Sequence, residues 1–195
     1  MKAYIVPGYQ GRPDEHWFPQ CLQILRKIGV DANVHVPANT HKPVLNDQRE
    51  KLQRELNASG EEKILIAHSL GAWLVLHMLL EVRDDVRMVI LVSGAAGELP
   101  HLDHEILNDI DPAFYAHDAA DFSDLRTKYY FSMFHGTDDQ IVPLENAEYL
   151  ASFLCVEIHR IEGGGHLNQD TLDKHPEKIE ELLAGIAEEI QTLLE

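Results

Sequence analysis

The chain has 195 residues, 45% of them apolar and 25% charged, which is enough for one domain with a buried core. Its formal net charge is −17, and an acidic surface repels phosphate backbones and anionic lipid, so nucleic-acid and membrane-surface roles are disfavoured. The sequence shows no signal-peptide pattern and no apolar run approaching the roughly 20 residues that span a bilayer. We read Cys21 and Cys155 as reduced thiols, with a structural disulfide as the alternative, and expect a cytoplasmic protein.

Short apolar runs alternate with longer amphipathic stretches along the chain. The apolar runs predict strands at 3–6, 33–36, 63–67, 87–92, 129–134 and 155–161. The amphipathic stretches predict helices at about 15–28, 44–57, 70–82, 144–153 and 176–194. This alternation is typical of βαβ units, so we expect an α/β fold in which helices cover both faces of a mostly parallel sheet.

The loop after the first predicted strand runs Pro7-Gly8-Tyr9-Gln10-Gly11. A glycine-rich loop in this position can cradle a phosphate when it carries G-x-G-x-x-G or G-x-x-x-x-G-K-[ST]. Neither pattern occurs in the sequence. The sequence therefore does not predict a phosphate-binding loop here, and the backbone N–H groups at the end of this strand are expected to have another use.

The segment AHSLG (67–71) joins the third predicted strand to the helix that follows it. It approximates G-x-S-x-G, in which a sharp turn leaves a serine hydroxyl exposed and small neighbours avoid a clash. Ala67 replaces the first glycine, which is a mild departure because alanine is the next smallest residue. Ser69 is therefore a candidate nucleophile, and we expect His68 beside it to line a pocket or to fill the turn.

About 35 residues separate the fourth and fifth predicted strands, which is long for a simple connection. We expect residues 95–127 to carry short helices and to form a small cap-like insertion within a single domain covering 1–195. The sequence HLDH (101–104) in this interval resembles a set of metal ligands, but a solvated acidic loop is the favoured interpretation, so no metal site is predicted.

The segment HGTDDQIVP (135–143) follows the fifth predicted strand. It resembles H-G-x-x-D-x-x-V-P, which α/β-hydrolases often carry at this place with the aspartate as the acid of a catalytic triad. That position is Asp139, whereas the neighbouring Asp138 could cap the next helix or hold the loop. Asp139 is preferred, with Asp138 as the alternative.

The segment EGGGHLN (162–168) follows the last predicted strand. Three glycines permit a flexible or positive-φ loop, and His166 at its tip is an unusual choice for core packing. A surface turn and a lone metal ligand are the alternative interpretations of this histidine.

Together these segments place Ser69, Asp139 and His166 in the Ser-Asp-His chain order of α/β-hydrolases. Each residue follows a strand, and open α/β sheets place their sites at the carboxyl ends of strands. In the hydrolase fold, the loop after the first of these strands and the residue after the nucleophile supply the N–H groups of the oxyanion hole. We therefore expect Tyr9 and Leu70 to form it, with Gln10 as an alternative donor.

The N-terminal loop with EHWFPQ, the AHSLGA turn, HGTDDQIVP and GGGHLN together resemble the small serine hydrolases grouped with retinoblastoma-binding protein 9 and the YdeN-like proteins. The resemblance spans essentially the entire chain. It implies a compact α/β-hydrolase with six strands in the order 2-1-3-4-5-6, with Ser69 as nucleophile, Asp139 as acid and His166 as base.

The expected activity is cleavage of a small ester, thioester or amide through an acyl-enzyme, a carboxylesterase-like reaction. We expect Gly8, Gln10 and His68 to contact a small-molecule acyl substrate, and no metal or organic cofactor to be needed. The alternatives are a catalytically idle binding module and transfer of the acyl group to an acceptor other than water. A monomer or weak homodimer is expected.

Overall fold

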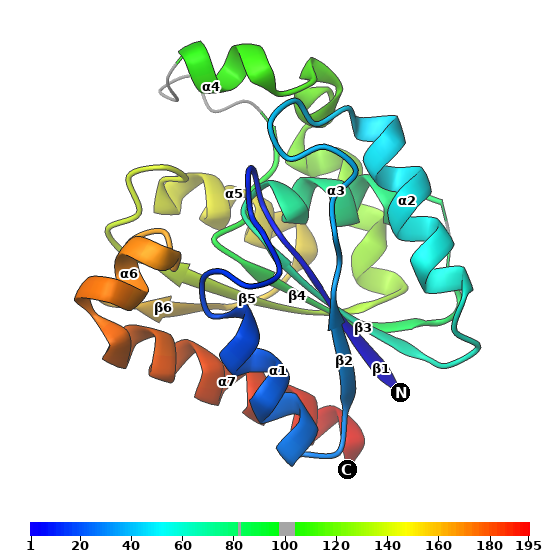
Figure 1. Cartoon of the computed structure of the whole chain (residues 1–195). Coiled ribbons are helices and arrows are strands. Elements are labelled where there is room, and N and C mark those ends of the chain that lie inside the picture. Colours follow the sequence, from blue (N-terminus) through cyan, green and yellow to red (C-terminus); the bar gives the residue numbers. More distant parts are fainter. Residues whose placement is uncertain (82, 98–103) are drawn as a thin grey trace.

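The computed structural model describes residues 1–81, 83–97 and 104–195. Its centre is a parallel sheet of six strands in the order β2-β1-β3-β4-β5-β6, which confirms the predicted fold class and strand order (Figure 1). The strands are β1 (Lys2–Val6), β2 (Asp31–Val34), β3 (Lys63–His68), β4 (Val86–Val92), β5 (Tyr130–Gly136) and β6 (Ile158–Ile161).

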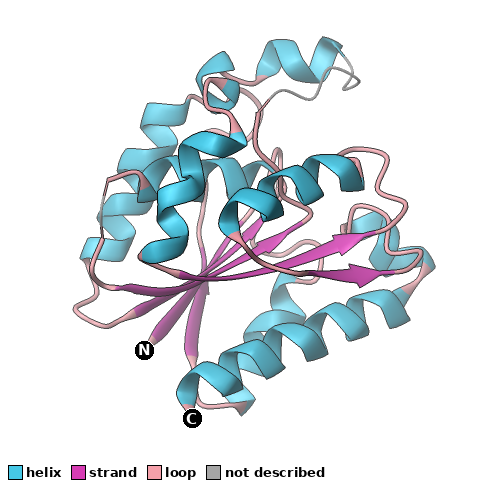
Figure 2. Ribbon diagram, turned by 180° about the vertical axis from the view of Figure 1, so that it is seen from behind, coloured by secondary structure: helices cyan, strands magenta, loops and turns pink. Residues whose placement is uncertain are grey.

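Helices cover both faces of the sheet, as the turned view in Figure 2 also shows. One face packs against α2 (Leu45–Asn57), α3 (Leu70–Leu79) and α5 (Leu144–Leu154), and the other against α1 (Phe18–Lys27) and α7 (Pro176–Leu194). The short helix α6 (Gln169–Lys174) precedes α7. None of the helices in the described ranges is both long and apolar enough to cross a bilayer.

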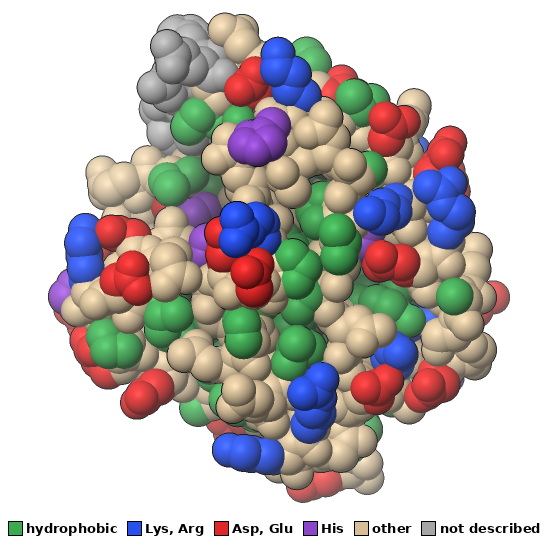
Figure 3. All heavy atoms as spheres, viewed as in Figure 1, with side chains coloured by type: hydrophobic (Ala, Val, Ile, Leu, Met, Phe, Trp, Pro, Cys, Tyr) green, Lys and Arg blue, Asp and Glu red, His purple; other side chains and the backbone are tan. Residues whose placement is uncertain are grey.

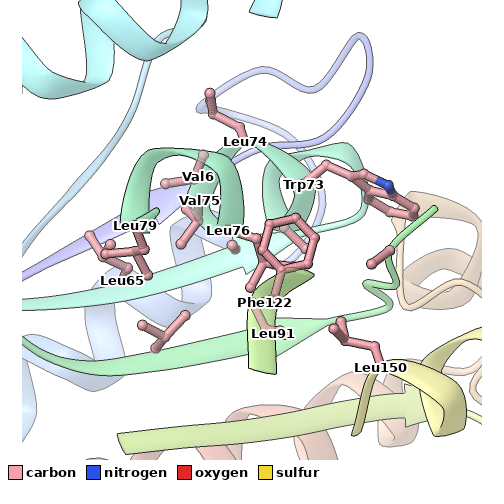
Figure 4. Packing of buried hydrophobic residues seen from close by; sticks show 14 of the residues in the cluster. Val6, Leu65, Trp73, Leu74, Val75, Leu76, Leu79, Leu91, Phe122 and Leu150 are labelled. Carbon is pink, nitrogen blue, oxygen red and sulfur yellow. The ribbon is translucent and has the colours of Figure 1, made fainter. Parts of the chain in front are cut away.

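The two central strands divide their side chains between two cores. In β3, Ile64 and Ile66 belong to the core under α1 and α7, whereas Leu65 and Ala67 belong to the core under α3. This alternation follows from the two-residue period of a strand, and burial on both faces explains why the run reads as continuously apolar. Figure 4 shows α3 seated on this surface, with Val75, Leu76 and Leu79 among its packed side chains.

Two strands begin two or three residues away from the start expected from the sequence. β2 covers Asp31–Val34 instead of 33–36, and β6 begins at Ile158 instead of 155. β6 starts late because Cys155 ends α5 in the left-handed conformation, with φ 55°, which is incompatible with a strand. The sequence analysis also missed α6, whose six residues are too few to show a helical period.

The interval between β4 and β5 contains α4 (His104–Asp109) and two 3₁₀ helices, η1 (Pro112–Tyr115) and η2 (Ala119–Thr127). It is tied to α3, since the Trp73 indole N–H donates to the Gly97 carbonyl at 3.3 Å and His77 Nε2 donates to the Phe114 carbonyl at 2.9 Å. Of the HLDH segment, residues 101–103 lie outside the described residues.

The net negative charge is distributed rather than concentrated on the face shown in Figure 3, where Asp and Glu side chains lie among Lys and Arg. Surface ion pairs such as Arg87 with Glu62 and Arg160 with Glu148 mix the two signs. Exposed pairs of this kind contribute little stability individually, so the packed sheet carries most of it.

Several histidines are buried deeply enough that the loss of hydration outweighs any nearby carboxylate and disfavours the protonated ring. Burial lowers the pKa of His77 and of His135, whose Nε2 donates to the Val142 carbonyl at 2.8 Å. His35 lies against Glu55 at 2.7 Å, yet burial still lowers its pKa. These rings are therefore neutral in the folded protein at neutral pH.

The carboxyl end of β1 and the start of α3 approach very closely at Gly71. A Cβ there would lie 2.3 Å from the Val6 carbonyl oxygen and 2.7 Å from that of Pro7, so only glycine fits without a backbone shift. We expect Gly71→Ala to lower the free energy of unfolding by about 1–3 kcal/mol, measured by urea denaturation. Gly60→Ala is the matched control, because an added Cβ there meets nothing within 4 Å and should change stability by less than about 0.5 kcal/mol. An equal effect of both substitutions would contradict the packing argument.

The buried neutral histidines predict a loss of stability in mild acid. Because their folded-state pKa values lie below the unfolded value of about 6.5, the unfolded chain binds more protons once the pH falls below that value. The free energy of unfolding should thus be fully present above about pH 6.5 and fall toward pH 5, by about 1.4 kcal/mol per pH unit for each extra proton. Urea denaturation at a series of pH values measures the slope, which His77→Phe should flatten. A free energy that stays constant over this range would refute the prediction.

Candidate active site

Ser69 stands at the turn between β3 and α3, at the carboxyl edge of the sheet. Its backbone has φ 52° and ψ −127°, a conformation that L-residues seldom adopt, and its N–H donates to the Val92 carbonyl at 2.9 Å. Small residues surround the turn: a Cβ on Gly8 would lie 2.7 Å from the Ser69 Cβ. The sharp turn therefore holds the hydroxyl at the carboxyl end of the buried strand β3.

His166 reaches Ser69 from the loop that follows β6. Its Nε2 lies 2.9 Å from the Ser69 Oγ, and its Nδ1 lies 2.8 Å from Asp139 Oδ2. The glycines before it supply the conformations that the loop needs, with φ 68° at Gly163 and 52° at Gly165. One continuous chain of hydrogen bonds thus joins a carboxylate, an imidazole and a hydroxyl.

Asp139 is the carboxylate in this chain, and the competing candidate Asp138 is not. Asp139 is 4% exposed, and its Oδ1 accepts hydrogen bonds from the N–H groups of Ile141 and Val142, both at 2.9 Å. Asp138 instead accepts the Gly165 N–H at 2.8 Å. The two neighbouring aspartates therefore make different contacts. Asp139 contacts the His166 ring, and Asp138 holds the backbone of the loop that carries His166.

His68 lies directly before Ser69 and holds the same loop from the other side. Its Nε2 donates to the His166 carbonyl at 3.0 Å, which fixes the tautomer because a carbonyl oxygen only accepts. Burial, with the neighbouring His166, lowers the pKa of His68 well below its usual value. Since the ring stays neutral, the contact persists across the neutral pH range. His68 also lines the cavity, so both expected roles are present.

Two backbone N–H groups beside Ser69 are available to a ligand. Neither the Tyr9 nor the Leu70 N–H donates a hydrogen bond to another residue in the described part of the chain, and both residues line the cavity. The alternative donor, the Gln10 N–H, is engaged with the Thr40 carbonyl at 3.2 Å. The Gln10 side chain donates to the Tyr9 hydroxyl and is not among the described residues that line the cavity, which does not support its expected substrate contact.

A cavity of about 170 Å³ opens at Ser69. Most of its wall is apolar and comes from α3, from the interval after β4 and from the loop after β5; the residues are Leu70, Trp73, Ile106, Ile110, Tyr115, Ile141 and Val142. A smaller part is polar, with His16 and Asn168 beside His166. The sequence analysis had not assigned most of these residues to the site, although the position of Trp73, one helical turn after Ser69, was an available signal.

The residues in the described ranges contain no group of three or more His, Cys, Asp or Glu side chains arranged to hold a metal ion. Both cysteines are free: Cys155 is exposed, and burial raises the pKa of the Cys21 thiol to about 12. Neither cysteine is among the described residues that line the cavity at Ser69. The arrangement around Ser69 is instead suited to moving a proton between a hydroxyl and an imidazole.

Comparison with known proteins places the chain in a family. A model of the family described as serine hydrolase matches residues 3–184. A Bacillus subtilis protein described as the hydrolase YdeN is 30% identical over 171 residues, covering 87% of each chain. The crystal structure of the ydeN gene product superposes with a TM-score of 0.74, covering 87% of this chain and 89% of that one.

The fold has wider structural relatives. Est1E from Butyrivibrio proteoclasticus superposes with a TM-score of 0.77 at 18% identity, covering 98% of this chain and 87% of that one. At this identity the likeness concerns the fold alone. With the family match over most of its length, the chain belongs to the serine hydrolase family and is a YdeN-like hydrolase with an α/β-hydrolase fold.

Proposed function

We propose that this serine hydrolase cleaves small esters, with Ser69 as nucleophile, His166 as general base and Asp139 as the acid that orients it. The observation that carries the proposal is the hydrogen-bonded chain from Asp139 Oδ2 through the His166 ring to Ser69 Oγ, with steps of 2.8 and 2.9 Å. Both distances are within the range required for proton transfer between a nucleophile and its base.

The chemistry follows from the positions of these groups. His166 Nε2 takes the hydroxyl proton as Ser69 Oγ attacks the substrate carbonyl, and the Asp139 carboxylate stabilises the imidazolium. The Tyr9 and Leu70 N–H groups receive the oxyanion, and one such donor contributes about 2.7–4 kcal/mol to lowering the barrier. His166 then gives its proton to the leaving group. Water, activated by the same imidazole, releases the acid and restores Ser69.

The cavity favours small acyl groups. Its volume of about 170 Å³ is below the range of about 300–1,000 Å³ typical of pockets for drug-sized ligands. The apolar wall suits an aliphatic chain, and Trp73 and Tyr115, whose ring centroids lie 6.2 Å apart, occupy space that a longer chain would need. A short-chain carboxylesterase is the substrate class that fits these limits.

Labelling with a fluorophosphonate probe tests the role of each group. We expect Ser69 to be the modified residue in the wild type, Ser69→Ala to abolish labelling, and His166→Ala and Asp139→Asn to lower kcat/KM for a short ester by about 10⁴-fold. Intact-protein and peptide mass spectrometry locate the label.

Asp138→Asn is the matched control, because an asparagine Oδ1 can still accept the Gly165 N–H. Its loss of activity should stay within about tenfold, since an amide retains this hydrogen bond. Equal losses in Asp138→Asn and Asp139→Asn would contradict the assignment of Asp139. Absence of labelling in the folded wild type would favour an idle binding module, and ester products formed with added alcohols would identify an acyltransferase.

Acyl-chain selectivity tests the size of the cavity. Wild-type kcat/KM should be at least about tenfold higher for p-nitrophenyl butyrate than for the decanoate, because about six extra methylenes find no apolar wall to cover them. Tyr115→Ala removes part of that wall and should shift the preference toward the longer ester. Faster turnover of the decanoate by the wild type would disprove the small-acyl proposal.

A further inference from the structure

We propose that His16 and Asn168 form a hydrogen-bonding subsite for an uncharged polar group in the leaving-group part of the substrate. The inference rests on the proposed function of Ser69 and names its substrate class. That class is short apolar acyl esters or amides whose alcohol or amine part carries a hydroxyl, ether or amide oxygen.

His16 presents an unused imidazole to the cavity. It precedes α1 with φ 54°, and its backbone N–H donates to Gln169 Oε1 at 2.8 Å, which fixes the residue against the start of α6. Its ring packs against Phe18 and His68, with centroids 5.2 and 5.7 Å away. Nδ1 is the ring nitrogen that is buried without a partner, so Nε2 is the one left to meet a ligand.

Asn168 offers a second hydrogen-bonding group on the same side. Its Oδ1 accepts the N–H groups of Asp170 and Thr171 at 3.0 and 3.3 Å and so caps α6. With the carbonyl oxygen engaged, the amide Nδ2 remains, and it donates to no other residue of the described segments. A donor-only amide beside an imidazole matches an oxygen acceptor on the substrate.

The position of these two residues assigns them to the leaving group. His166 returns its proton to the leaving group, so that part of the substrate must lie beside the His166 ring. Asn168 is two residues after His166 in the same loop, and the rings of His16, His68 and His166 follow one another at 5.7 and 5.1 Å. The acyl part then faces the apolar wall formed by Ile106, Ile110 and Tyr115.

The subsite is suited to an uncharged group. Burial lowers the pKa of His16, so its ring is neutral at neutral pH. No lysine or arginine lies among the described residues that line the cavity. A carboxylate would therefore lose its hydration without gaining a cationic partner, whereas an ether, hydroxyl or amide oxygen would gain hydrogen bonds.

Matched ester pairs test the inference. The first pair is 2-methoxyethyl butyrate and n-butyl butyrate, which differ only by an ether oxygen in place of a methylene in the alcohol. The wild-type kcat/KM ratio of this pair should exceed that of His16→Phe/Asn168→Ser by about fivefold, the effect of one hydrogen bond. Serine keeps a hydroxyl that can cap α6 but removes the amide donor. Comparing ratios between proteins cancels the different intrinsic reactivity of the two esters.

Three controls complete the experiment. His175→Phe, an exposed position before α7, should keep the wild-type ratio. Methyl 4-methoxybutanoate and methyl hexanoate place the same oxygen in the acyl part, and their ratio should not change in the double variant. Wild-type kcat/KM should be at least about tenfold higher for the butyrate ester of glycolamide than for that of glycolate, which has the same shape but a negative charge.

The outcomes separate this inference from the proposed function. An unchanged alcohol-pair ratio in the double variant, with Ser69 still labelled by fluorophosphonate, would overturn the subsite and leave the proposed function intact. An effect on the acyl pair instead would overturn the leaving-group assignment, and equal rates for the glycolamide and glycolate esters would overturn the uncharged class. A wild type that neither hydrolyses these esters nor labels at Ser69 would overturn both proposals.

Discussion

The backbone of Ser69 is the constraint on which the site depends. A residue with φ 52° and ψ −127° is held only where its surroundings leave no alternative. Gly71 brings the start of α3 against the carbonyls that end β1, and Gly8 brings the loop after β1 against Ser69 itself. The same close approach brings Tyr9 and Leu70, whose N–H groups donate to no other residue in the described ranges, into the wall of the cavity with Ser69. Local strain and the arrangement of donors therefore have one structural cause.

The loop that follows β6 and carries His166 is held by residues at the ends of two other strands. His68, at the end of β3, holds the His166 carbonyl, and Asp138, after β5, holds the Gly165 N–H. With the backbone held at these two neighbouring residues, the ring of His166 connects Ser69 with Asp139. His68 does this with a proton on Nε2, and its burial keeps the ring neutral. His68 and His166 are both buried, and their roles differ because their rings contact different partners.

Much of this arrangement could be predicted from sequence because it depends on local backbone requirements. The turn at Ser69, the glycines before His166 and the paired aspartates are short segments that follow strands, and strand order brings their ends together. The sequence favours Asp139 over Asp138, and in the structure Asp139 contacts the His166 ring whereas Asp138 accepts the Gly165 N–H. The walls of the cavity were not predictable in the same way. Tyr115 comes from a segment without a motif, and EHWFPQ, which contains His16, gave that histidine no role of its own; only the three-dimensional packing brings both residues to the cavity at Ser69. Helix α6 was missed because six mostly polar residues show no apolar period.

Cys155, the left-handed residue that ends α5, offers a position for labelling the protein. The chain has two cysteines, and Cys21 is buried with a thiol that resists ionisation, whereas Cys155 is exposed. Cys155 also precedes β6, so it lies toward the amino ends of the strands, away from the edge that carries Ser69. A maleimide dye should therefore attach at a single natural position without engineering. Such a conjugate would allow rotational tumbling or single-molecule fluorescence to be measured, or the protein to be immobilised on a surface, while Ser69 stays unobstructed.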